Sequence, residues 1–270
     1  MIGARIGSDI PSITAWEKHG WVEIKNSRGI YIRTDSGEVV ILSPSIITPY
    51  TISPIKLWHE IHRRVKEGDT ATFHGYGLTV RDGLHIVFQE AGGPSYLPRG
   101  STPPIEMIEK ARGLLHIIIV EPLESVVDEG VKILNRSKPI DTRKIASDLR
   151  NVIGVGPGMT PAGDDFVSGV LLALHVLGVE VDHSPLVEHA VEFSSWPSWK
   201  MLEHSSHGCT FRYLTTLFHA MLERNSQALL DGILQMTGLG SSSGISLLTG
   251  FLETLKVSYQ GYPLDLARSP

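Results

Sequence analysis

The stretch GVGPGMTPAGDDFVSGVLLAL, Gly154 to Leu174, decides the fold of the second half of this chain. Its first ten residues hold four glycines and two prolines. Glycine raises the entropy cost of ordering the backbone and each proline removes an N–H donor, so these residues disfavour a regular helix or a central strand. The apolar run after Asp164-Asp165 favours a helix. The sequence therefore predicts a shaped loop that leads into the N-terminus of a helix.

Such a loop favours an anion. Backbone N–H groups between Gly156 and Gly163 can point at one ligand, and the positive end of the helix dipole adds to them. Asp164 and Asp165 suit the dipole but would repel phosphate or a carboxylate. A Mg²⁺ ion held by both aspartates would remove the conflict, because Mg²⁺ is commonly bound by carboxylates together with substrate phosphate. The simpler interpretation is that the aspartates cap a helix whose glycines permit close packing.

A second segment, SGISLLTGFLETL from Ser243 to Leu255, repeats this design. When Gly163 is aligned with Gly244, a second glycine follows six residues later in both segments, at Gly169 and Gly250. We expect two loop-helix units whose N-terminal ends converge on one ligand, with serine hydroxyls from the second unit as donors. The small residues also predict a close approach of the two helix axes.

These residues carry a family resemblance. GVGPGMTPAGDDFVSGVLLAL resembles the signature of the AllH-like subunit of oxamate carbamoyltransferase. The resemblance is strongest over residues 149–177, weaker over 237–255 and around 209–214, and loose across the N-terminal half. The resemblance implies a part in the phosphorolysis of oxalurate to oxamate and carbamoyl phosphate during allantoin breakdown, in an assembly with other subunits. The family pattern has Ser where this chain has Ala162, so one hydroxyl contact is missing. The resemblance assigns no catalytic residues, and the roles below follow from chemistry.

The candidate catalytic residues are Asp164, Asp165 and Thr160, and the two aspartates are also the candidate metal ligands. Backbone amides would orient phosphate against the ureido carbonyl, while Thr160 or serine hydroxyls stabilise the developing oxyanion. A hydroxyl at Thr210 and a guanidinium at Arg212 suit a substrate carboxylate. The candidate substrate-binding residues are Gly156, Gly158, Gly163, Thr210, Arg212, Ser242, Ser243 and Gly244.

Two other functional classes remain open from the sequence. One is a non-catalytic subunit that binds a phosphorylated or carboxylated ligand and organises a partner enzyme. The other is a hydrolase or lyase acting on an amide or carboxylate, with the aspartates as metal ligands or as acid and base. In addition, His204, His207 and Cys209 resemble half of a zinc site, but no second Cys/His pair completes it and ordinary polar histidines near a turn are favoured.

The composition of the chain further narrows its functional class. The chain has 270 residues, 41% of them hydrophobic, with a formal net charge of −5 and no Lys/Arg-rich block, which argues against nucleic-acid and anionic-membrane partners. Cys209 is the single cysteine, so no internal disulfide forms. The first residues lack a secretion-signal pattern, and every apolar run is shorter than the roughly 18 residues of a membrane span. We expect a cytoplasmic protein that binds a small anionic substrate.

The character of the chain changes near residue 100. Residues 1–100 hold short β-branched and aromatic runs around glycine turns, which predicts a small antiparallel sheet or barrel, and the pattern over 53–68 predicts one helix that covers or plugs it. Residues 91–104 are the linker candidate. Residues 101–270 predict a mainly helical domain, although 116–120 fits either a buried strand or the continuation of a helix. The expected fold class is α+β.

Overall fold

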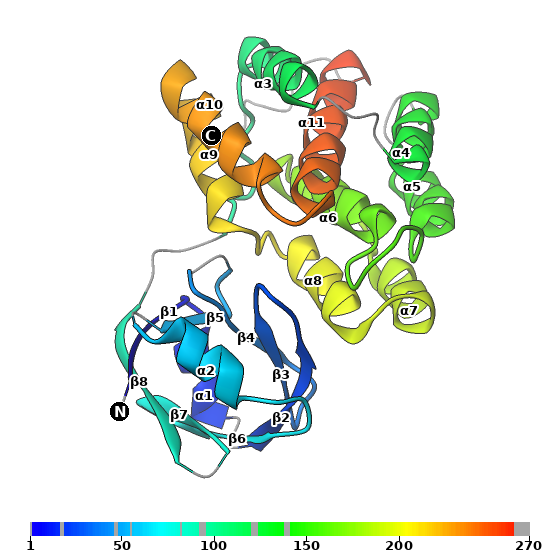
Figure 1. Ribbon diagram of the computed structural model, residues 1–270. Coiled ribbons are helices and arrows are strands. Elements are labelled where there is room, and N and C mark those ends of the chain that lie inside the picture. The colour runs from blue at the N-terminus through cyan, green and yellow to red at the C-terminus, as the bar shows by residue number, and fades with distance from the viewer. Residues whose placement is uncertain are drawn as a thin grey trace. The chain divides into compact units, whose positions relative to one another are not determined.

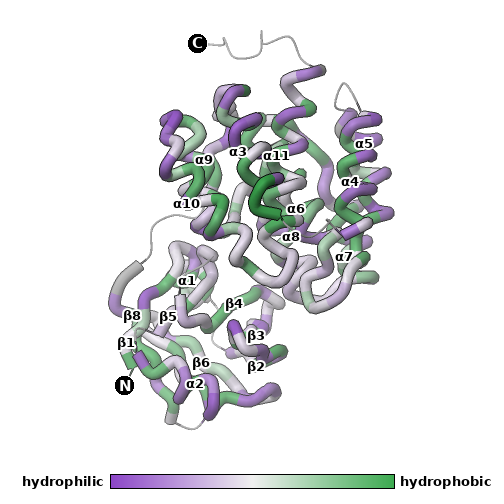
Figure 2. The backbone as a smooth tube through the Cα atoms, turned by 45° about the horizontal axis from the view of Figure 1, so that its top comes forward, coloured by the Kyte–Doolittle hydropathy of each residue, from purple (hydrophilic) through white to green (hydrophobic). Residues whose placement is uncertain are grey.

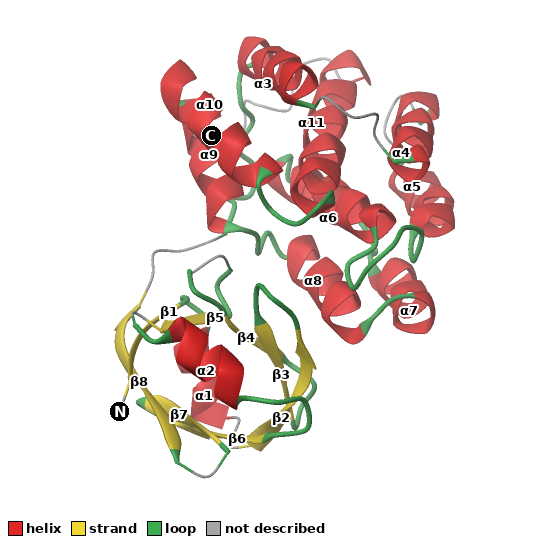
Figure 3. Ribbon diagram, viewed as in Figure 1, coloured by secondary structure: helices red, strands yellow, loops and turns green. Residues whose placement is uncertain are grey.

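The computed structural model describes residues 2–16, 19–45, 48–54, 56–81, 83–91, 96–119, 124–137 and 141–261. The chain forms two compact units, residues 1–96 and 97–270 (Figure 1). The first unit is rich in strands, and the described residues of the second form helices and loops (Figure 3). The α+β class predicted from the sequence is confirmed.

The strands of the first unit close into a barrel. Their order around the described part of the barrel is β1-β5-β4-β3-β2-β6-β7-β8. Strand β1 pairs in parallel with β8, and β4 pairs in parallel with β5, so the barrel is mixed rather than purely antiparallel. The strands are β1 (Ile2–Ile6), β2 (His19–Lys25), β3 (Ile30–Thr34), β4 (Val39–Leu42), β5 (Thr51–Pro54), β6 (Thr70–His74), β7 (Gly77–Val80) and β8 (Leu84–Ala91).

Every second side chain along a strand points into the barrel and fills its interior. In β3, Ile30 and Ile32 are fully buried and the intervening residue is less so, as the two-residue period of a strand requires. Two short helices, α1 (Ile10–Trp16) and α2 (Trp58–Arg64), bring Ile10 and Ile61 to the same core. The helix predicted over 53–68 is therefore confirmed but shorter, because residues 51–54 pair as strand β5.

The second unit is helical. Its elements are α3 (Ile105–Ile118), α4 (Ser125–Arg136), α5 (Thr142–Leu149), the short 3-10 helix η1 (Arg150–Val152), α6 (Ala162–Val176), α7 (Ser184–Phe193), α8 (Trp196–Ser206), α9 (Arg212–Leu222), α10 (Ser226–Thr237) and α11 (Ser243–Gly261). The ambiguous run 116–120 continues helix α3 as far as Ile118, and residue 120 lies outside the described residues. Part of the predicted linker, residues 92–95, also lies outside them. In the described parts of the chain, no helix is both long and apolar enough to cross a membrane.

Helices α6 and α11 pack closely at the centre of this unit. From Ala162 to Leu174 every residue of α6 is buried, and hydrophobic residues dominate it (Figure 2). A Cβ atom at Gly169 would overlap the carbonyl oxygen of Leu247, and one at Gly250 would overlap that of Phe166. The predicted close approach of the two helices is confirmed, and it brings the loops that precede them to one end of the unit.

Candidate functional site

Three glycines of the loop before α6 have positive φ, and two of them are also tightly enclosed by backbone atoms. Gly154 has φ +76° and Gly156 has φ +127°, in the left-handed region that side chains rarely adopt. A Cβ at Gly154 would lie 2.7 Å from the carbonyl oxygen of Phe193, and one at Gly156 would lie 2.7 Å from the backbone nitrogen of Ala162. Ser195 Oγ donates a hydrogen bond of 2.6 Å to the Met159 carbonyl and fixes the middle of the loop. The loop is therefore folded tightly against its own helix and its neighbours.

Asp164 holds this loop in place. Its Oδ1 accepts a 2.6 Å hydrogen bond from the Gly154 N–H, and its Oδ2 accepts one of 2.6 Å from the Ser198 hydroxyl in α8. The residue is only 1% exposed. Both carboxylate oxygens are thus used within the protein, which gives Asp164 a structural role that joins the glycine loop, α6 and α8.

Asp165 has a different environment. It is 4% exposed, it contacts the hydroxyls of Thr160 and Ser243, and its Oδ2 is buried without a hydrogen-bond partner among the described residues. Burial raises the pKa of Asp165 well above its ordinary value of 3.8; hydrogen bonds from Ser243 and Thr160 oppose this, and the negative charges of Asp164 and Glu124 add to it. A neutral, protonated Asp165 is the form that this environment favours.

The two predicted loops meet at this carboxyl group. Thr160 Oγ1, from the loop before α6, lies 3.1 Å from Ser243 Oγ, at the start of α11. Both residues are partly exposed, whereas Asp165 lies behind them. The structure therefore brings Thr160, Asp165 and Ser243 together as a pair of accessible hydroxyls backed by a buried carboxyl group.

Three predicted site residues make contacts within the protein that leave no group available to a ligand. A Cβ at Gly163 would overlap the Val152 carbonyl oxygen, and one at Gly244 would overlap that of Met236. Their N–H groups donate inside their own loops, Gly163 to Val155 and Gly244 to Leu239, each at 3.0 Å. The third is Asp164. Gly158, by contrast, has φ +94° and open space around its Cα, and Ser242 is partly exposed.

Thr210 and Arg212 lie by the opposite end of α6. They follow Gly208, at which a Cβ would lie 2.5 Å from Nε2 of His175, near the C-terminus of that helix. Asp164 and His175 are separated by about 16 Å of helix at 1.5 Å per residue. Thr210 is buried with its hydroxyl unpartnered in the described structure, and Arg212 is exposed at the start of α9. The structure does not bring these two residues to the Thr160 and Ser243 hydroxyls.

His207, from the segment considered as half of a zinc site, lines a separate pocket of about 350 Å³ together with His175 and His183. Burial lowers the pKa of His175 from its ordinary 6.5. The rings of His183 and His207 are 5.4 Å apart, and Cys209 is buried. Among the described residues, no three His, Cys, Asp or Glu side chains converge as metal ligands, so the zinc alternative gains no support.

Several residues of the site were missed by sequence reasoning. Glu124 precedes α4, and its Oε2 would lie 3.2 Å from a Cβ at Gly156. Ser198 and Ser195 come from the beginning of α8 and fix Asp164 and the loop. None of these residues carries a local signal, because each is ordinary in its own segment and becomes relevant only through folding.

The fold and site define a class of protein in which a barrel unit is joined to a helical unit with two glycine-loop helices that meet at a buried carboxyl group. Residues 152–255 match the model of the family described as oxamate carbamoyltransferase subunit AllH. This match confirms, over that part of the chain, the resemblance found in the glycine loop. No curated protein and no solved structure was found to match the chain.

Proposed function

We propose that this chain is a subunit of a carbamoyltransferase-type enzyme that handles oxalurate, oxamate and carbamoyl phosphate at the Thr160–Ser243 hydroxyl pair. The observation that carries the proposal is the buried Asp165 carboxyl group behind two partly exposed hydroxyls from different loops. The family match over residues 152–255, which describes a subunit of oxamate carbamoyltransferase, supports the reaction class.

In the proposed reaction, a phosphate oxygen attacks the ureido carbonyl carbon of oxalurate, and the bond from that carbon to the oxamate nitrogen breaks. The carbonyl oxygen gains negative charge before this bond breaks, so a hydroxyl donor at Thr160 or Ser243 stabilises the intermediate. The departing nitrogen needs one proton. Protonated Asp165 supplies it through a hydroxyl, which gives its proton to the nitrogen and receives one from the carboxyl group; the proton of the attacking hydrogen phosphate then restores the carboxyl group.

Burial of Asp165 defines what it can contact. Because its Oδ2 is inaccessible to solvent, Asp165 acts through Thr160 and Ser243 or after movement of the loop. The same burial favours a second candidate function, in which this subunit binds a phosphorylated or carboxylated ligand and organises a catalytic partner. In both cases the chain works with other subunits, in keeping with the description of the family as a subunit.

The Mg²⁺ predicted from the sequence stays a prediction. Of the two aspartates, Asp164 has both oxygens engaged by Gly154 and Ser198, so an ionised Asp165 would be the remaining ligand for a cation. Among the described residues no set of three metal-ligand side chains surrounds it. The steps proposed above use protein hydroxyl and carboxyl groups.

Calorimetric titration tests the proposed site. Wild-type protein, Asp165→Asn and Thr160→Ala/Ser243→Ala are titrated with carbamoyl phosphate and with oxamate, each with and without Mg²⁺. We expect both variants to bind at least tenfold more weakly, about 1.4 kcal/mol, while the exposed Asp231→Asn control binds as wild type. Unchanged affinity in both variants would remove these residues from the site.

An activity measurement separates the two candidate functions. Carbamoyl phosphate formation from oxalurate and phosphate is followed for the assembled enzyme containing wild-type or Thr160→Ala/Ser243→Ala subunit. A catalytic subunit predicts a large fall in kcat, because the oxyanion donors are lost. A ligand-binding subunit predicts an unchanged kcat at saturating substrate with altered ligand dependence.

A further inference from the structure

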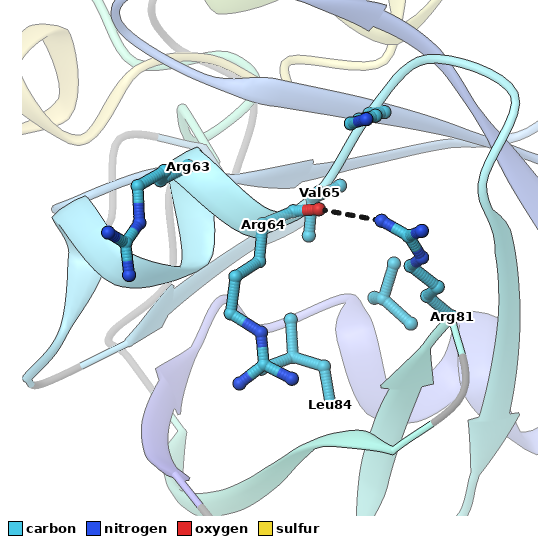
Figure 4. Close-up of a pocket in the computed structure, with 7 residues that line it drawn as sticks. Arg63, Arg64, Val65, Arg81 and Leu84 are labelled. Atoms are coloured by element: carbon cyan, nitrogen blue, oxygen red, sulfur yellow. Dashed lines mark hydrogen bonds between the residues drawn. The ribbon is translucent and has the colours of Figure 1, made fainter.

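A basic pocket lies in the barrel unit, apart from the residues of the proposed function. It has a volume of about 360 Å³, within the range of small-molecule sites, and Arg63, Arg64, Lys66 and Arg81 line it. The remaining lining residues, Val65, Val80 and Leu84, are apolar and buried. Figure 4 shows the Arg64 and Arg81 side chains on different sides of the pocket, with Leu84 beside the Arg64 guanidinium. Four cationic and three apolar residues thus line the pocket.

The cations come from separate segments. Arg63 and Arg64 belong to the last turn of α2, where positive charge also suits the helix dipole. The dipole does not explain Lys66, which follows the helix, or Arg81, which lies in the turn after β7. Arg81 has φ +56°, and its Nη1 donates a 3.3 Å hydrogen bond to the Arg64 carbonyl, so the turn and the helix end are joined at the pocket (Figure 4).

The positive charge of the cluster is only partly balanced. Arg64 lies 3.5 Å from Glu60, and Arg81 lies 3.9 Å from Asp69. For the side chains of Arg63 and Lys66, the described residues supply no ion-pair partner within 4.0 Å. Among the described residues, ion pairs within 4.0 Å thus balance Arg64 and Arg81 but not Arg63 and Lys66, in a chain whose formal net charge is −5. A bound anion would relieve the repulsion among them.

We propose that this pocket binds a small, multiply charged phosphate compound. Guanidinium groups suit phosphate because they donate in a planar fork, and their placement on different sides suits a ligand with more than one phosphate. This site is independent of the glycine loops, which belong to the other unit of the chain.

Inorganic pyrophosphate is the probe, titrated calorimetrically into the full-length chain at about 50 mM salt, where screening is moderate. The test variant is Arg64→Gln/Lys66→Gln, and the matched control is Arg28→Gln/Lys56→Gln, which removes the same charge from exposed positions outside the pocket. Circular dichroism and the melting temperature check that each variant folds, and single Lys66→Gln serves if the double variant does not. We expect saturable binding that the pocket variant weakens at least tenfold and the control leaves within twofold.

Two results would overturn the proposal. Equal weakening in both double variants would mean that pyrophosphate responds to overall charge, and no saturable binding to the wild type at millimolar pyrophosphate would mean that the pocket takes no such ligand. A short single-stranded RNA tests the competing occupant. RNA binding that depends on Arg64 and Lys66, without pyrophosphate binding, would replace the small ligand with a nucleic acid.

Discussion

The loop-helix units that begin α6 and α11 pack alike but differ in their polar residues. In both units the first glycine, Gly163 or Gly244, donates a 3.0 Å hydrogen bond into its own loop and lies against a carbonyl oxygen. In both, the glycine six residues later contacts the partner helix, and the contacted residues, Leu247 and Phe166, occupy equivalent positions. The two units are therefore related by an approximate internal symmetry.

The differences between the units lie where chemistry is expected. The positions of Asp164 and Asp165 in the first unit are Ile245 and Ser246 in the second. The first loop is also three residues longer, because its hydrogen bond joins positions 163 and 155, eight apart, whereas the second joins 244 and 239, five apart. Thr160, in the longer loop, lies 3.1 Å from Ser243 at the start of the second unit, measured between the hydroxyl oxygens. Residues that are the same in both units therefore fix the helix crossing, and residues that differ between the units build the candidate site.

The largest effect is expected at the helix crossing. Gly169→Ala places a methyl group on the Leu247 carbonyl, and the helices must separate, so we expect the free energy of unfolding to fall by about 3 kcal/mol. Gly113→Ala in α3 is the matched control, since nothing lies within 4 Å of its Cβ position; higher helix propensity should leave stability unchanged or raised by about 1 kcal/mol. Urea unfolding of both variants makes the comparison, and equal effects would refute the close crossing.

The next effect separates the two aspartates. Asp164→Ala removes the acceptor for the Gly154 N–H and the Ser198 hydroxyl, so we expect a loss of about 2 kcal/mol in the free energy of unfolding. Asp165→Ala removes a buried carboxyl group with an unpartnered oxygen, and its hydroxyl partners, Thr160 and Ser243, are partly exposed and can bond to water instead, so about 1 kcal/mol should be lost. Denaturant unfolding at pH 7 measures both. A larger loss for Asp165→Ala would reverse the structural role assigned to Asp164.

The raised pKa of Asp165 predicts a pH dependence. Between the unfolded value, near 3.8, and the higher folded pKa, the folded state holds more protons than the unfolded state. Stability contributed by this group is therefore greatest below pH 3.8 and is lost as pH rises through the folded pKa, by up to about 1.4 kcal/mol per pH unit. Unfolding of wild type and Asp165→Asn at several values from pH 4 to 8 should show wild type losing stability relative to the variant. Parallel curves would contradict the raised pKa.

The smallest effect concerns the hydroxyl pair. Ser243→Ala removes a hydrogen bond to Asp165 and the contact with Thr160, so we expect a loss of about 1 kcal/mol in stability. The exposed Ser241→Ala should change stability by less than about 0.5 kcal/mol. Thermal unfolding compares them, and an equal shift in melting temperature would mean that Ser243 does not contribute to a specific cluster.

Much of the fold was predictable, because local patterns carry it. Short β-branched and aromatic runs around glycine turns predicted strands, and the helical spacing that includes Ile61 predicted a helix that covers or plugs the barrel. Parallel pairing of β1 with β8 was not predictable, since it depends on which distant segments meet when the barrel closes. The start of the predicted helix at residue 53 was wrong because pairing with β1 overrode local helical preference.

The site was predictable in part. The sequence pointed to Thr160, Asp165 and Ser243, because glycine-rich loops before helices are recognisable motifs. It could not show that Asp164 is engaged by Gly154 and Ser198, because the second partner lies 34 residues away on another helix. Thr210 and Arg212 were grouped with the loop only by residue type, and their place beside the C-terminal part of α6 sets them apart.

The sequence by itself determined the α+β class, the glycine loops, the two loop-helix units and the resemblance over the second half, because propensity, periodicity and motif spacing are local properties of the chain. Only the tertiary structure decided which aspartate is engaged and which is buried with an unpartnered oxygen, and which hydroxyls meet it. Burial and hydrogen bonding depend on neighbours far apart in the sequence, and these neighbours set the charge state of Asp165 and the role of Asp164.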